Sequence, residues 1–361
     1  MVLNRRAFLA TASAAALMAH PALAVSRFLP KPDGWKTFEL TTKIDLPRDG
    51  KAAQVWVPVP SHSDPLWSKP GETSWTSTAE NVDLVTDPVS GAAMVHAVWP
   101  AGDGAATLEV VSTVSTQGRK ADLDHPGDAT LTAADRAEYT AATNLLPTDG
   151  IVLETAQSIV EGVEDPVVKA RLIYDWVVES TERNPETRGC GLGDIASMLE
   201  RGDLTGKCAD LNALYVGLVR SVGLPARDLY GLRVAPSAFG YKSLGAGSAT
   251  VSKAQHCRAE VFLDGFGWVP ADPADVRKVV LEEPPKTLTL ADTEVQTVRE
   301  ALFGASEGNW VPLNHAHDVV LPGSENGPVG FLMYPQAEIG GVRQDELDPA
   351  SFVYEITVRE V

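Results

Sequence analysis

The front of the chain, up to about residue 114, shows the alternation and turn breaks that are typical of β-strands. Three runs combine β-branched or aromatic residues with turn-forming breaks between them: residues 38–44, 53–59 and 108–114. The stretch has no helical period, so we predict an antiparallel, β-sandwich-like module over residues 25–116. Residues 117–150 are polar and rich in turn formers, which indicates a connector.

A helical period of apolar residues begins after residue 150. Four apolar residues at positions i, i+3, i+4 and i+7 predict a helix from about residue 166 to residue 182: Ala170, Ile173, Tyr174 and Val177. A second and more strongly amphipathic helix follows Cys208 and is stopped by Gly-Leu-Pro at residues 223–225. Its apolar stripe consists of Leu211, Leu214, Tyr215, Leu218, Val219 and Val222.

The period then changes from helical to alternating. Along residues 256–263, Cys257 begins the apolar face and His256 begins the polar face of a predicted strand. Residues 264–267 form a predicted turn, and a return strand begins at Trp268. The hairpin therefore follows the amphipathic helix directly in the predicted order of elements.

Predicted helices followed by a predicted hairpin thus occupy residues 151–280. The C-terminal extension, residues 281–361, is expected to contain a short helix near 292–302 and a closing strand at 352–358. The predicted elements therefore divide the chain into a β-rich front module, residues 151–280, and the C-terminal extension.

Residues 1–24 carry the parts of an export signal: Arg5 and Arg6, an apolar run over residues 7–19, and an Ala-x-Ala ending at Ala24. The run is too short to span a bilayer core of about 30 Å. The surroundings of the arginine pair resemble a twin-arginine signal, and a general secretory signal is the alternative. We expect cleavage after Ala24 and a periplasmic or secreted protein.

Composition narrows the choice of partners. The 361 residues are 44% hydrophobic, enough for a sizeable core, and the formal net charge is −18. Loss of the two signal arginines would make that charge −20. Such an excess of acids repels nucleic-acid phosphates and anionic lipid, so we expect neither nucleic-acid binding nor stable membrane insertion.

Cys208 is the candidate nucleophile because it lies at the start of the strongly amphipathic helix, in Thr-Gly-Lys-Cys-Ala-Asp. A helix N-terminus favours an anion, and the thiolate is the nucleophilic form of cysteine. The unpaired N–H groups of a first helical turn can also serve as an oxyanion hole. The alternative is a buried thiol that only packs.

His256 and Asp272 are the candidate partners of that thiol. His256 follows Cys208 by 48 residues, and Asp272 follows His256 by 16 residues, just past the return strand. Two adjacent antiparallel strands can set Asp272 beside His256, which would fix the imidazole tautomer while the other ring nitrogen faces the thiol.

Three motifs resemble the core of bacterial transglutaminase-like proteins: residues 206–214 with 223–227, residues 256–261, and residues 267–273. The resemblance covers about residues 150–275. It implies a papain-like α+β fold in which a helix-borne cysteine packs on an antiparallel sheet. It also implies that Cys208 is the nucleophile, His256 the general base and acid, and Asp272 the residue that orients the histidine.

By the same resemblance, the reaction passes through a thioester that water or an amine resolves. The chain has no calcium loop of the D-x-[DN]-x-[DN]-G type, so a cysteine peptidase or amidase is favoured over an amine-transferring transglutaminase. We expect a peptide or protein substrate and neither a cofactor nor a metal. The alternative is a non-catalytic periplasmic binding or assembly protein on the same scaffold.

The remaining cysteines leave two alternatives open. Cys190 and Cys257 could form a disulfide in an oxidising compartment, or they could be two independent buried thiols. Cys257 is expected to point away from His256 across the strand, so that a disulfide would leave Cys208 free.

A metal site is a weaker possibility. His315 and His317 share one face of an extended segment, but third and fourth ligands are not evident. Surface positions, or the rim of an active cleft, are the favoured interpretation of these histidines.

Overall fold

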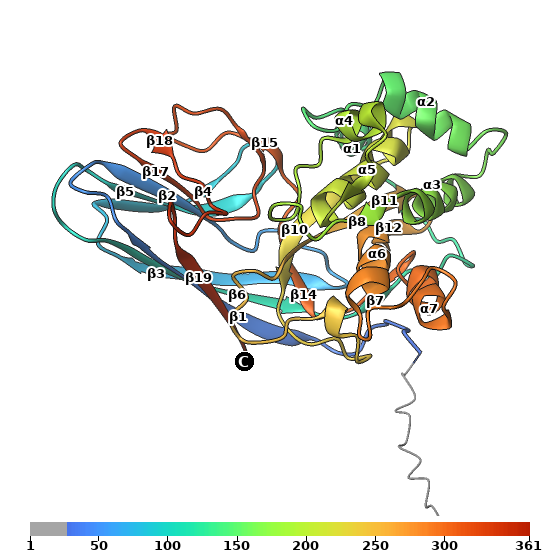
Figure 1. Ribbon diagram of the computed structural model, residues 1–361, viewed down its shortest axis with the longest axis horizontal. Coiled ribbons are helices and arrows are strands. Elements are labelled where there is room, and N and C mark those ends of the chain that lie inside the picture. The colour runs from blue at the N-terminus through green and yellow to red at the C-terminus, as the bar shows by residue number, and fades with distance from the viewer. Residues whose placement is uncertain (1–26) are drawn as a thin grey trace, which may run out of the picture.

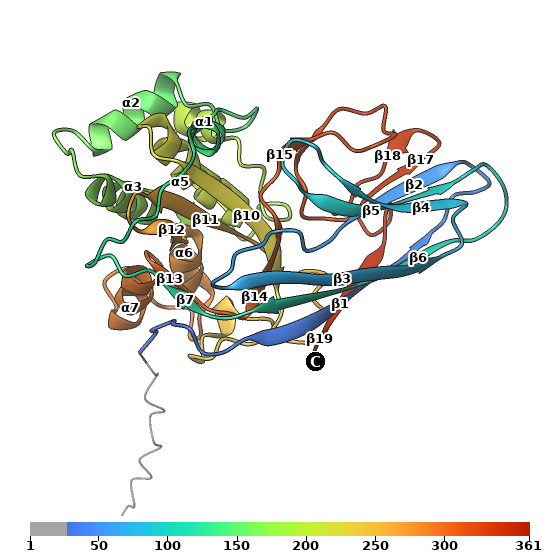
Figure 2. The ribbon, with the colours of Figure 1, turned by 180° about the vertical axis from the view of Figure 1, so that it is seen from behind.

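The computed structural model describes residues 27–361 (Figure 1). The predicted export signal, residues 1–24, lies outside the described residues. The described chain forms a β-sandwich at one end and a helix-rich core at the other, as Figures 1 and 2 show from opposite sides. The α+β class with a β-rich module, expected from the sequence, is confirmed.

Two antiparallel sheets make the sandwich. The first sheet has the order β18 (Val342–Arg343), β17 (Gln336–Ile339), β2 (Ala53–Pro58), β5 (Ala93–Trp99), β4 (Asn81–Thr86). The second has the order β19 (Tyr354–Glu360), β1 (Lys36–Leu46), β6 (Ala106–Thr116), β3 (Ser68–Ser77). Burial alternates strictly along β6, so its apolar residues, among them Leu108, face a core that Val55, Val95 and Trp99 share.

The last strands of the chain complete both sheets of this sandwich. β17 pairs with β2, and β19 pairs with β1 from Phe38 to Ile44. Ile356 and Val358 of β19 are buried in a cluster that also contains Leu232 and Val311 of the helix-rich core. Residues of the C-terminal extension therefore join the front module to the core.

The core is an antiparallel sheet with helices on one face. Its order is β12 (Gly267–Ala271), β11 (Gln255–Leu263), β10 (Ala226–Arg233), β14 (Trp310–Asn314). α5 (Cys208–Ser221) packs on this sheet and is buried from Cys208 to Arg220. The helices that pack around α5 include α2 (Gly150–Ile159), α3 (Pro166–Ser180) and α6 (Pro273–Glu282).

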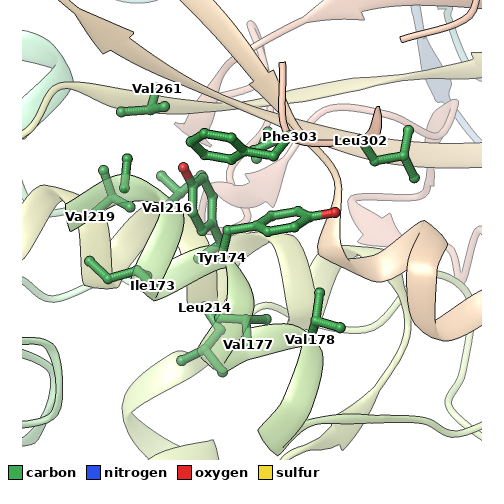
Figure 3. Close-up of a cluster of buried hydrophobic side chains, with 14 of the residues drawn as sticks. Ile173, Tyr174, Val177, Val178, Leu214, Val216, Val219, Val261, Leu302 and Phe303 are labelled. Carbon is green, nitrogen blue, oxygen red and sulfur yellow. The ribbon is translucent and has the colours of Figure 1, made fainter. Parts of the chain in front are cut away.

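Figure 3 shows why these elements hold together. Tyr174 of α3, Leu214 of α5 and Val261 of β11 meet in one apolar cluster, which Phe303 closes. All but Phe303 are completely buried. Burying side chains of this size contributes about 1.5–3 kcal/mol each, so the helix that begins at Cys208 is firmly fixed on the sheet.

Short elements complete the described chain. They are α1 (Ala133–Thr140), α4 (Ile195–Arg201), α7 (Thr293–Ala301), a 3-10 helix (Lys242–Leu244), and the strand pairs β7 (Arg119–Lys120) with β13 (Ala305–Ser306), β8 (Glu182–Arg183) with β9 (Thr205–Gly206), and β15 (His317–Val319) with β16 (Val329–Phe331). β7 and α1 lie within residues 117–150. No helix within residues 27–361 has the length and apolar character that crossing a membrane requires.

Candidate active site

Cys208 is the first residue of α5, and the side chain of Asp210 holds the chain around it. The Asp210 carboxylate accepts the N–H of Lys207 at 3.0 Å and the N–H groups of Leu192 and Gly193 at 2.9 Å. A Cβ at Gly191, whose φ is +97°, would collide with this carboxylate. The loop before α4 is therefore fixed against the start of α5, beside the thiol.

The backbone N–H of Cys208 remains available at the start of α5, next to the thiol. The N–H of Ala209 donates to the carbonyl of Cys190 at 2.8 Å. The N–H of Cys208 itself has no hydrogen-bond partner among the described residues. An unpaired N–H at this position is the kind of donor that stabilises an oxyanion.

His256 and Asp272 form a buried pair. His256 is the second residue of β11, and Asp272 follows β12 and caps the N-terminus of α6. The two side chains meet at 2.8 Å between His256 Nε2 and Asp272 Oδ2, and both residues are 3% exposed. Nε2 is thus the nitrogen that faces the carboxylate, which leaves Nδ1 as the ring nitrogen able to exchange a proton with a substrate or a thiol.

Asn212 connects this pair to the cysteine-bearing helix. It lies one turn after Cys208, and its Nδ2 donates to Asp272 Oδ1 at 3.1 Å and to the Cys257 carbonyl at 2.8 Å. Its Oδ1 accepts the N–H of Ala274 at 3.2 Å. The Asn212 amide is fully buried, and both its nitrogen and its oxygen are hydrogen-bonded. These bonds set the distance between α5 and the histidine–aspartate pair.

A second carboxylate adds to the charge at the histidine. Asp275 Oδ2 lies 3.4 Å from His256 Nε2, and its other oxygen lies 2.5 Å from the Arg233 guanidinium. Burial and Arg233 lower the pKa of His256, but the carboxylates of Asp275 and Asp272 outweigh them and raise it above its ordinary value. The pKa of Asp272 is raised by burial and by Asp275, although His256 opposes this.

Cys208 and His256 line the same cavity, which has a volume of about 580 Å³. Cys208 is 4% exposed, and Asp272 lies behind His256 rather than on the cavity wall. The structure thus brings the three residues singled out in the sequence to one site. Their catalytic roles stay predictions.

The other two cysteines also lie at this site. Cys190, Cys208 and Cys257 are free thiols in one buried cluster with Met333 and Tyr334. Hydrogen bonding with the thiols of Cys208 and Cys257 lowers the pKa of Cys190, whereas burial raises the pKa of Cys257. Cys257 lies on the opposite face of β11 from His256. Because α5 packs on that face, the Cys257 thiol lies in the same cluster as Cys208.

His315 and His317 do not gather a ligand set. His317 Nε2 lies 3.4 Å from Asp228 Oδ2, and His315 contacts Tyr139. Within residues 27–361 the one group of three side chains spaced to hold a metal ion is His256, Asp272 and Asp275. Its carboxylates already bind the imidazole and Arg233, so these contacts account for the group without a metal.

Sequence reasoning did not identify Asn212, Asp275 or Cys190 as parts of this site. The sequence could have placed Asn212 at the site, because a residue four positions after Cys208 lies on the same face of the helix. Asp275 lies in the first turn of the helix that Asp272 caps. Cys190 comes from a loop, and no local period predicts where a loop will pack.

Comparison with known proteins identifies the family of the chain. The profile of the transglutaminase-like superfamily matches residues 153–273, which run from α2 to the first residue of α6. The chain belongs to the transglutaminase-like superfamily.

The chain is similar to one protein in sequence and to two solved structures in fold. An uncharacterized protein of Haemophilus influenzae is 35% identical over 342 residues, covering 90% of this chain and 91% of that protein. The solved structure of a candidate cysteine protease from Cytophaga hutchinsonii is 16% identical, has a TM-score of 0.50, and aligns with 92% of this chain and 100% of its own. The periplasmic domain of TgpA from Pseudomonas aeruginosa is 12% identical with a TM-score of 0.34, over 72% of this chain and 92% of that one.

Replacing Asp272 by Asn is expected to lower the pKa of His256, because it removes one of the two carboxylates that raise it. Asn is also a good helix cap, so the start of α6 should persist. The pKa can be measured by NMR titration of the His256 ring. Asp165→Asn, which alters the cap of α3, is the matched control and should leave the titration unchanged. An unchanged His256 pKa in Asp272→Asn would contradict the assigned pairing.

Proposed function

We propose that this protein is an exported thiol enzyme that cleaves or transfers amide-linked acyl groups on peptides or proteins through a thioester on Cys208. The observation that carries the proposal is the shared cavity of Cys208 and His256, with His256 Nε2 bound to Asp272 at 2.8 Å. This arrangement supports a triad in which the nucleophile lies at a helix start and the base is oriented by a buried carboxylate.

The proposed chemistry proceeds in balanced steps. His256 Nδ1 takes the thiol proton of Cys208 as Sγ forms a bond to the carbonyl carbon of the scissile amide. The N–H of Cys208 is the proposed donor to the resulting oxyanion. His256 then gives its proton to the leaving amine, the C–N bond breaks, and a thioester remains.

The second half of the reaction decides between hydrolysis and transfer. His256 takes a proton from water as the water oxygen bonds to the thioester carbon, and the C–S bond then breaks. His256 returns the proton to Sγ, which restores the thiol, and the carboxylic acid leaves. A primary amine that enters instead yields a new amide. We favour hydrolysis, in a periplasmic or secreted enzyme, because the chain has no calcium loop of the type used by calcium-activated cross-linking enzymes and because residues 1–24 have the pattern of an export signal.

Incubation with a peptide library, with and without a primary amine, tests the proposal. Mass spectrometry should find shortened peptides without the amine, and amine adducts of the same acyl fragments only as a minor product when the amine is present. The Cys208→Ala protein serves as the blank. Peptides that bind but are recovered intact from both proteins would contradict the proposal and favour a non-catalytic binding protein.

A further inference from the structure

The cavity at Cys208 has a charge opposite to that of the whole chain. The chain has 48 acidic residues against 30 lysines and arginines. Six of these 30 basic residues line the cavity, whereas Glu346 is the one acidic residue among the described residues of its wall. The six are Arg183, Arg188, Lys207, Arg233, Lys253 and Lys278.

Carboxylates outside the cavity wall neutralise the arginines. Arg183 is paired with Glu282, Arg188 with Asp345, and Arg233 with Asp275. These three contacts account for half of the positive charge around the cavity.

The three lysines are not neutralised by carboxylates of their own. Lys278 lies 3.8 Å from Glu282, a carboxylate that Arg183 already occupies. Lys207 and Lys253 form no ion pair with any residue of the described chain, 27–361. An excess of positive charge therefore remains, and it belongs to lysines rather than to arginines.

The burial of Lys278 makes this excess of positive charge costly. Its side chain is 18% exposed, and burial together with the nearby Arg233 lowers its pKa to about 8, although Asp275 and Glu282 oppose this. The ammonium group of Lys278 is largely buried, and Glu282, its nearest counter-ion, is shared with Arg183. Contact with a further anion would therefore stabilise the charged form of Lys278.

The three lysines line the same cavity as the reacting groups. Lys207 directly precedes Cys208, Lys253 lies three residues before His256, and Lys278 is on α6, the helix that Asp272 caps. An anion held by these lysines would consequently lie close to the amide that Cys208 attacks.

We propose that the cavity selects acidic peptide segments, whose carboxylates bind Lys207, Lys253 and Lys278 next to the scissile amide. This inference rests on the proposed function for the nature of the bond that is cleaved. The net charge of −18 does not prevent such binding, because at physiological salt charges more than about 8 Å apart are largely screened. Nearby apolar residues of the same wall, Leu347 and Phe352, can contact the aliphatic parts of the peptide.

Binding to the Cys208→Ala protein tests this without requiring turnover. The probes are two labelled peptides of equal length with blocked ends, one rich in Glu and the other with Gln in place of each Glu. Fluorescence anisotropy at about 0.15 M salt, where the repulsion by the whole chain is screened, should show the Glu peptide binding about tenfold more tightly, with the advantage shrinking as salt is raised further.

Single lysine variants show which lysines bind the acidic peptide. Lys253→Gln and Lys278→Gln should each weaken binding of the Glu peptide by about threefold or more and leave the Gln peptide unchanged. Lys51→Gln, which changes an exposed lysine outside the cavity, should have no effect. Lys253 is itself exposed, so its variant remains informative if Lys278→Gln does not fold.

The possible failures can be told apart. Equal binding of the two peptides, or an equal effect of Lys51→Gln, would overturn the inferred substrate class. If the unaltered protein cleaves neutral peptides as fast as acidic ones and Cys208→Ala is inactive, the substrate class is wrong and the proposed function stands. Selective binding of acidic peptides that are never cleaved would overturn the proposed function alone.

Discussion

Cys208→Ala is expected to lower kcat/KM by about 10⁴-fold or more, because no thioester can form without the thiol. The fold should persist, since Ala is a good helix former and the substitution removes a single buried sulfur atom. Steady-state kinetics on a peptide that the protein cleaves measures the loss, and thermal unfolding checks the fold.

The other two cysteines are the matched controls for that variant. Cys190→Ala and Cys257→Ala alter thiols of the same buried cluster without removing the residue at the start of α5. Both variants should retain measurable turnover. If either loses as much activity as Cys208→Ala, or if Cys208→Ala stays active, the nucleophile has been assigned to the wrong thiol.

The second large effect concerns stability rather than catalysis. Glu260 is completely buried and is held by Arg119 and by Arg227, the latter at 2.7 Å. Arg227 stacks on Trp268 at 3.8 Å from the ring centroid, and Arg119 stacks on Trp67 at 4.2 Å. Glu260→Gln would leave both guanidinium groups buried without a counter-charge, which typically costs about 3–5 kcal/mol in the free energy of unfolding.

The loss should depend on pH in a definite direction. Burial raises the pKa of Glu260, but Arg119 and Arg227 lower it from 4.5 to about 2. Because the folded-state pKa is below the unfolded one, the carboxylate contributes stability above about pH 4.5, and that contribution disappears as the pH falls toward 2. Urea denaturation at pH 7 and pH 3 should show the difference between the two proteins narrowing.

A surface pair provides the comparison for Glu260. Glu109 and Lys43 lie 3.1 Å apart, with side chains 41% and 59% exposed. Glu109→Gln is expected to change the free energy of unfolding by less than about 1 kcal/mol at either pH. A Glu260→Gln protein that loses no more than Glu109→Gln would show that the buried cluster does not stabilise the fold.

The sequence predicts those parts of the site that depend on local periodicity. The apolar stripe after Cys208 predicts the helix α5, although α5 is buried on all its faces and not only along the stripe. The alternation from His256 places Asp272 on the neighbouring strand end, because a short hairpin has few possible registers. The helix start thus predicts the position of Cys208, and the hairpin predicts the pair of His256 and Asp272.

What the sequence does not predict depends on contacts between distant segments. β14 enters the core sheet next to β10, and its Trp310 donates to the carbonyl of His256 at 3.0 Å. β17 and β19 complete sheets that begin some 300 residues earlier in the chain. No local period specifies which sheet edge such a strand will join.

The polar face of β11 illustrates the same limit. Its residues His256, Arg258 and Glu260 alternate with apolar ones, a pattern that usually indicates one solvated face. All three are buried, because Trp310 and Arg119 from distant segments cover this face. Alternation therefore identified the two faces correctly but not whether the polar face contacts water.

The most direct test of the account is to trap the acyl-enzyme. The protein is mixed with a peptide ester that acylates faster than it deacylates, quenched in acid, digested, and mapped by mass spectrometry. We predict an added mass equal to the acyl group on the peptide that contains Cys208, removable by neutral hydroxylamine and absent from Cys208→Ala. An adduct on Cys190, Cys257 or another residue, with turnover intact in Cys208→Ala, would contradict the account.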